Sequence, residues 1–145
     1  MKAVAEDMIG VLAGIVIAGI FLAIAYQLLA GFGIEQQKKQ AMSSLNELAS
    51  VINYACGAGD GTAFTRTLNL PLMVKEISGY DRKICLVIEN SHCINTNCPL
   101  EIIPIYLNNT FFQTKAKVSK DNTIGVEFEI IRTSGGVQVM SRAVS

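Results

Sequence analysis

The chain has 145 residues, enough for one small domain beside a long helix. Lysine plus arginine and aspartate plus glutamate number 12 each, so the formal net charge is zero. This balance provides no basic excess for nucleic acid and no polybasic cluster for anionic lipid, and we therefore predict no nucleic-acid partner. Half of the residues are hydrophobic, and many of them lie in the first 34.

An apolar run from Met8 to Ile34 is the first element, and it carries no polar side chain between Met8 and Ala25. A helix that crosses a bilayer needs about 20 mainly apolar residues, so this run is long enough. A cleaved secretory signal would have a shorter apolar region and a basic start. Glu6 and Asp7 precede this run instead, and we interpret it as a retained membrane helix.

Small residues recur every four positions within the run, at Gly10, Gly14 and Ala18 and again at Gly19 and Ala23. This spacing lets the backbones of neighbouring membrane helices approach closely. Gly and Ala are also common in membrane helices generally, and the pattern fits that alternative as well.

The helical period continues beyond the apolar run, but with one apolar face. That stripe consists of Ala41, Leu45, Leu48, Ile52 and Ala55. We therefore predict one helix from about Ala5 to about Ala55, apolar all round in its first half and amphipathic in its second. The glycine-rich stretch 57–61 ends it.

Beyond the helix the period changes to two, which is typical of strands. We predict strands at Phe64–Leu70, Lys83–Glu89, Leu100–Tyr106, Thr110–Val118, Thr123–Thr133 and Val137–Ala143. Pro104 marks the third as an edge strand. Residues 120–122 and 134–136 form the last turns. The fold class is therefore α+β, with an antiparallel sheet covering the amphipathic half of the helix.

The four cysteines lie beyond the apolar run, at Cys56, Cys85, Cys93 and Cys98. An even count in a small domain beside a membrane helix favours two disulfides outside the cytoplasm. The pairing we favour joins Cys93 to Cys98 and Cys56 to Cys85, although two other pairings remain open. Asn108 begins an N-glycosylation sequon, which fits an exported surface loop.

Catalytic and metal-binding patterns are weak. His92 is the single histidine, in a short polar loop beside Cys93, where adjacent residues are poorly placed to act as thiolate and base. A zinc site at Cys85, His92, Cys93 and Cys98 has suitable ligand types, but it lacks the CxxC knuckle. Paired acid and base carboxylates are also lacking, because Glu127 and Glu129 share one solvated strand face. We predict no enzyme, cofactor or metal.

The long helix, apolar and then amphipathic, followed by a β-rich head, resembles type IV pilins and particularly archaeal pilin-like proteins. The start Lys2-Ala3-Val4-Ala5-Glu6 is similar to the processing site of short archaeal prepilin leaders, and the junction 56–61 with 68–71 is also similar to theirs. Ala3 stands where Gly is more usual, and Ala5-Glu6 where one archaeal class has Ser-Pro.

The resemblance implies cleavage after Ala3 by a prepilin peptidase, which leaves Val4 as the new N-terminus. A second register cuts before Lys2 and makes Glu6 the fifth mature residue. In either register Glu6 lies near a new α-amino group and can neutralise it, in its own or the next subunit.

The resemblance divides the chain into a short leader at 1–3, a membrane or filament-core helix at 4–34, an amphipathic continuation at 35–56 and an extracellular head at 57–145. It implies a subunit of an extracellular filament for adhesion or cell contact. Such a subunit starts in the cell membrane and polymerises with itself with the help of an assembly platform and ATPase. The alternative is a permanently membrane-anchored binding or accessory module outside the cytoplasm.

Overall fold

A computed structural model describes residues 2–107, 118–119 and 121–144, with side chains from Gly10 onward. The chain forms two compact units, Met1–Gln36 and Gln37–Ser145, which we call unit 1 and unit 2. The predicted strand Thr110–Val118 lies outside the described residues except for Val118, which forms an isolated bridge with Ile124.

The helix α1 (Lys2–Cys56) is a few residues longer than the predicted segment at its N-terminal end and ends one residue later. It ends where the glycine-rich stretch begins, since the amide of Gly57 donates to the carbonyl of Tyr54 at 3.1 Å and the chain then turns. Gly61 has a φ of 82°, a conformation that favours glycine. The predicted position of the helix end is therefore confirmed.

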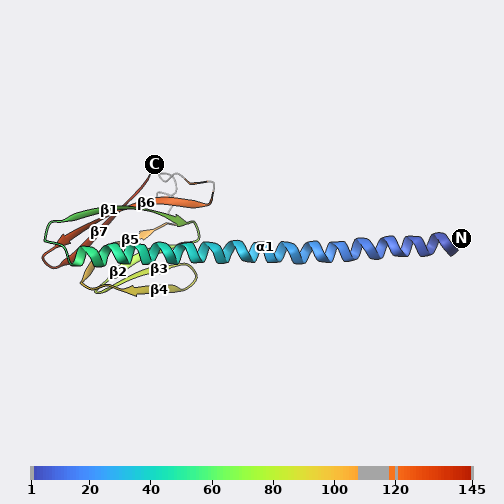
Figure 1. The fold of residues 1–145 in the computed structure, drawn as a ribbon, viewed down its shortest axis with the longest axis horizontal. Helices are drawn as coiled ribbons and strands as arrows, with labels where there is room; N and C mark the ends of the chain where they lie inside the picture. The colour runs from blue at the N-terminus through green and yellow to red at the C-terminus, as the bar shows by residue number, and fades with distance from the viewer. Residues whose placement is uncertain (1, 108–117, 120, 145) are drawn as a thin grey trace. The chain divides into compact units, whose positions relative to one another are not determined.

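Unit 2 contains one sheet of seven strands within the described residues, in the order β1-β6-β7-β5-β2-β3-β4. The strands are β1 (Ala63–Pro71), β2 (Glu76–Tyr80), β3 (Lys83–Val87), β4 (Ser91–Asn95), β5 (Leu100–Tyr106), β6 (Thr123–Thr133) and β7 (Gly136–Ala143). Figure 1 shows β1 and β6 on one side of the C-terminal part of α1 and β3 and β4 on the other, because the sheet curls around the helix. The fold is α+β, as the sequence predicted.

The prediction of an edge strand at Leu100–Tyr106 is wrong, because β5 lies between β7 and β2. Pro104 is tolerated in this interior strand because neither register includes it. The pairing with β7 ends at Ile102, and the pairing with β2 has a bulge between Ile77 and Gly79. The missing N–H of a proline removes no ladder hydrogen bond at such a bulge.

Strands β2 and β4 were not predicted. β2 contains Gly79, a poor strand former, but a Cβ there would lie 2.4 Å from Cγ2 of Ile102, so close packing against β5 requires glycine. β4 is a short, mostly exposed edge strand, and it shows no apolar alternation to reveal it. The interpretation of Ser91, His92 and Cys93 as loop residues is therefore wrong.

The predicted apolar stripe of α1 forms one side of the core. All five of its residues are at most 1% exposed. Alternate residues of β6 face them, namely Ile124, Val126, Phe128 and Ile130, which are also buried. The strand alternation and the helix stripe thus meet across one apolar layer, as the sequence predicted.

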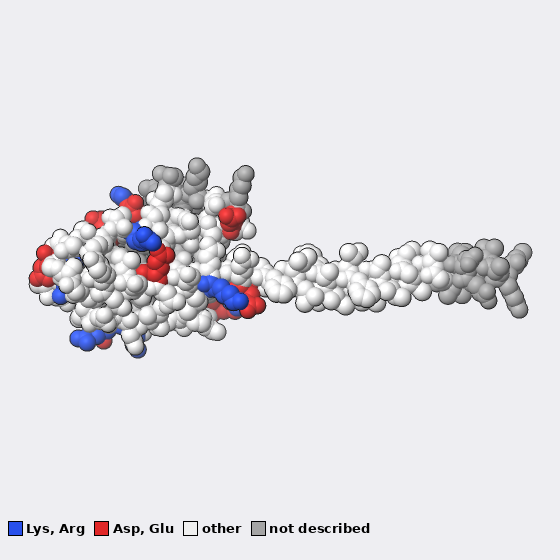
Figure 2. Space-filling view, in the orientation of Figure 1, with Lys and Arg blue, Asp and Glu red and all other residues white. Residues whose placement is uncertain are grey.

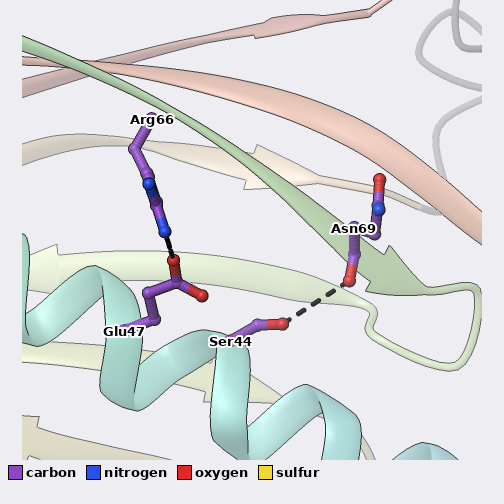
Figure 3. A network of polar contacts seen from close by, with 4 residues as sticks. All are labelled: Ser44, Glu47, Arg66 and Asn69. Carbon is purple, nitrogen blue, oxygen red and sulfur yellow. Dashed lines mark hydrogen bonds and ion pairs between the residues drawn. The ribbon is translucent and has the colours of Figure 1, made fainter.

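Polar contacts fasten the helix to both edges of the sheet. Figure 3 shows the β1 side, where Glu47 accepts from Nε of Arg66 at 2.7 Å and the hydroxyl of Ser44 donates to the carbonyl of Asn69 at 3.5 Å. Lys38 pairs with Glu89, between β3 and β4, at 2.9 Å. Both edges of the sheet therefore bind one helix, which is consistent with its curl.

Candidate membrane and assembly surface

Unit 1 exposes a continuous apolar surface. Between Gly10 and Ile34 every large hydrophobic side chain is at least 49% exposed, and Leu22 and Leu29 reach 72%. No Lys, Arg, Asp or Glu occurs in this range, and Figure 2 shows the corresponding stretch of helix in white, without a blue or red residue. Water alone is a poor solvent for such a surface, so it needs lipid or protein against it.

Within the described residues, this helix is the one long and apolar enough to span a membrane, and none of its most apolar window is buried. A lipid-facing surface of this length satisfies the geometric requirement for a membrane helix. The apolar half of α1 is therefore compatible with membrane insertion.

The small residues of unit 1 have no packing role within the chain itself. A Cβ built on Gly10, Gly14 or Gly19 meets nothing within 4 Å, and Ala18 lies in the same exposed stretch. Such glycines weaken an isolated helix by about 1 kcal/mol each relative to alanine. Any packing advantage that offsets this cost must come from a second molecule.

The predicted processing residues and the predicted charged residue Glu6 lie near the start of α1. Ala3, Val4 and Glu6 lie in the helical backbone of α1, but their side chains lie outside the described residues. Asn108 also lies outside them. The structure therefore does not test the predictions for cleavage, for the Glu6 charge or for glycosylation.

The cysteines of unit 2 form two disulfides, but the favoured pairing is wrong. The bonds join Cys56 to Cys98 and Cys85 to Cys93. Cys93 lies in β4, directly opposite Cys85 of β3, with the two Cα atoms 4.1 Å apart. The sequence pattern does not reveal that strand pair, and proximity in the chain favours Cys98 as the partner of Cys93 instead.

Two disulfides are typical of a domain outside the cytoplasm. They also leave no free thiol in the chain, so Cys93 does not serve as a thiolate beside His92, and Cys85, Cys93 and Cys98 are not free to bind zinc. The described residues contain no group of three metal-ligating side chains.

An open hollow of about 190 Å³ lies between the start of β5 and the turn joining β6 to β7, lined by residues that include Glu101, Thr133 and Gln138. It is smaller than most small-molecule sites, and neither a histidine nor a cysteine lines it. The large exposed surface of unit 1 is therefore the stronger functional candidate.

The pKa of Glu89 is lowered by its hydrogen bond and ion pair with Lys38, and further by the charge of Lys75. Both partners are well exposed, which is typical of a solvated surface pair rather than a catalytic site.

No family model, curated protein or solved structure matches this chain. The functional assignment therefore depends on the residues and the geometry described above.

Proposed function

We propose that this chain is a structural subunit of an extracellular filament that resembles archaeal type IV pili. The observation that carries the proposal is the continuous exposed apolar surface from Gly10 to Ile34, on the same helix α1 whose C-terminal part is enclosed by the disulfide-bonded head. Such a surface suits a helix that is first solvated by lipid and later by neighbouring copies of itself.

In this proposal the chain is made as a membrane protein, and a prepilin peptidase cuts it after Ala3 or before Lys2. An assembly platform and its ATPase then extract it. The apolar helices pack into a filament core through Gly10, Gly14 and Ala18, which leave room for a second backbone. Glu6 neutralises an α-amino group within that core, because an unpaired charge there is costly. The heads form the outer surface and mediate adhesion or contact with other cells.

The alternative is a permanently membrane-anchored binding or accessory module. It is favoured by the same length and composition of α1, which meet the requirement for a single membrane span. The two proposals differ in what contacts the small residues. Lipid tails adapt to any helix surface, whereas a packed helix neighbour requires glycine at a close approach.

A substitution at Gly14 separates the two functions. Gly14→Leu adds apolar volume that lipid accommodates, and nothing within the chain opposes it. We expect this variant to remain in the membrane fraction but to disappear from sheared surface filaments. Val16→Leu is the matched control, because it enlarges an exposed, non-glycine position of the same helix and leaves the small-residue face intact.

N-terminal sequencing of both fractions completes the experiment. The filament proposal requires peptides of this chain in purified filaments, with Val4 or Lys2 at the mature N-terminus. The anchored module is established instead if the wild-type chain keeps Met1 and stays wholly in the membrane fraction, and if the Gly14→Leu variant fractionates as the wild type does.

A further inference from the structure

The two disulfides of unit 2 are nested. Cys56–Cys98 spans 42 residues, and the Cys85–Cys93 bond lies entirely within that span. Strands β1 to β4 also lie within it, whereas β5, β6 and β7 follow Cys98 in the chain. The outer bond therefore closes a covalent ring that contains four of the seven described strands and leaves three outside.

The outer bond begins at the last residue of α1 and ends two residues before β5. The packing of residues 41–55 and the ion pairs of Lys38 and Glu47 take up tension along α1 first. Tension that then reaches Cys56 has two covalent routes onward. One runs through residues 57–97, and the other crosses directly to Cys98, whose Cα lies 5.7 Å away. Because a covalent bond does not lengthen under such a load, the direct route carries the tension and the ring remains slack.

The strand that receives the load is in a suitable geometry to resist it. β5 and β7 are the parallel neighbours of the described sheet, with Leu100 opposite Val137 and Ile102 opposite Val139. A load entering β5 at Leu100 and leaving β7 at Ala143 pulls the two strands from opposite ends. Hydrogen bonds between strands lie across the strand direction, so this pull loads them together rather than one after another.

Hydrogen bonds also hold the segment around Cys98 in place. The amide of Asn97 donates to Oδ1 of Asn53, on α1, at 2.8 Å. The buried hydroxyl of Thr96 donates to the carbonyl of Cys98 at 2.9 Å. On the other side of the bond, the amide of Val137 donates to the carbonyl of Pro99 at 2.9 Å. The outer bond is thus tied to α1 at one end and to β7 at the other.

We propose that the Cys56–Cys98 disulfide is a load-bearing shortcut: once the packing of α1 has yielded, the bond passes tension from Cys56 directly to Cys98, just before β5, and keeps residues 57–97, with β1 to β4, from being extended. This goes beyond the proposed function, because it concerns the route of a load along α1 whether the chain is a filament subunit or a membrane anchor. A negative result for the shortcut therefore leaves the choice between those two functions open. Failure of the filament proposal likewise leaves the shortcut untouched.

Single-molecule stretching of the full chain in detergent, with handles at its two ends, tests the proposal. At roughly 3.5 Å per extended residue, the ring of 42 residues hides about 140 Å of length in the oxidised chain. We expect reduction of the folded wild-type chain by dithiothreitol to lengthen the fully extended molecule by that amount. This measurement requires no variant to fold.

Two variants give opposite results if the bonds are nested. Cys85→Ser with Cys93→Ser is expected to leave the extended length of the oxidised chain unchanged, because the inner loop lies in the slack ring. Cys56→Ser with Cys98→Ser is expected to lengthen it by about 120 Å, since the inner bond still hides its own 8 residues. Lengthening by the first pair, or no lengthening by the second or by reduction, overturns the proposal.

Discussion

Unit 1 and unit 2 use the same kind of residue in opposite ways. Ile24 and Ile52 both lie on α1, yet Ile24 is 49% exposed and Ile52 is fully buried. In unit 2 the helix has one apolar stripe and a sheet to cover it, so its stability is contained within the chain. In unit 1 the helix is apolar all round, and whatever covers it lies outside the chain. One helix can therefore serve folding in one half and association in the other.

The largest expected effect separates the two disulfides within unit 2. Because a bond that closes a longer loop removes more entropy from the unfolded chain, Cys56→Ser with Cys98→Ser is expected to lower the free energy of unfolding by about 4 kcal/mol. Cys85→Ser with Cys93→Ser removes the bond that closes a loop of 8 residues, and this pair is expected to lower the free energy of unfolding by about 2.5 kcal/mol. Denaturant unfolding under oxidising conditions measures both, and the reverse order contradicts this account.

The comparison between the units is tested most directly by one substitution in each. Ile52→Ala leaves a cavity in the core and is expected to lower the free energy of unfolding of the head by about 3 kcal/mol. Ile24→Ala, in the exposed half of the same helix, is expected to leave head unfolding unchanged. Near-ultraviolet circular dichroism during denaturation reports both values. Equal losses of unfolding free energy in the two variants mean that the exposed half of α1 contributes to head stability, and this contradicts the contrast drawn between the units.

Substitutions at glycines test the same contrast between the units, with a smaller expected loss of stability. A Cβ on Gly136, whose φ is 152°, lies 2.2 Å from the carbonyl oxygen of Pro99, so Gly136→Ala is expected to lower head stability by about 2 kcal/mol. Gly135→Ala in the same turn and Gly14→Ala in unit 1 meet nothing within 4 Å, and neither is expected to destabilise the head. Thermal unfolding of the three variants measures this, and a loss at Gly135 equal to that at Gly136 contradicts it.

The smallest effect concerns the surface pair of Lys38 and Glu89. The pKa of Glu89 lies below its ordinary value of 4.5 in the folded chain, so the pair stabilises the head above that value. The contribution is lost as the pH falls through the lowered pKa and Glu89 becomes protonated. Glu89→Gln is therefore expected to lower the unfolding temperature slightly at pH 7 and to have no effect at strongly acidic pH.

Glu101→Gln is the control for the loss of an exposed carboxylate. A Glu89→Gln deficit that persists unchanged at acidic pH shows that packing of the side chain, and not its charge, is responsible.

Much of the fold follows from local pattern. The stripe on α1, the end of the helix at the glycines and the bounds of β6 are each set by residues close together in the chain, because helical and strand periods are local properties. The exposed apolar surface of unit 1 can also be predicted from composition. A helix without a polar face would have to be covered on all sides, and the head is too small to cover it.

Only the tertiary structure decided the pairing of distant segments. Pro104 indicates an edge strand by itself, but the bulge opposite β2 allows it in the interior. Cys93 lies near Cys98 in sequence, but β4 places it opposite Cys85. Strand neighbours and cysteine partners are chosen by which long-range register buries the most apolar surface, and a register is a property of two segments that neither sequence contains alone. The sequence by itself therefore determined which half of the helix is amphipathic and which half is apolar all round. The ring closed by Cys56 and Cys98 was decided only by the tertiary structure, because it depends on how the strands of the sheet pair.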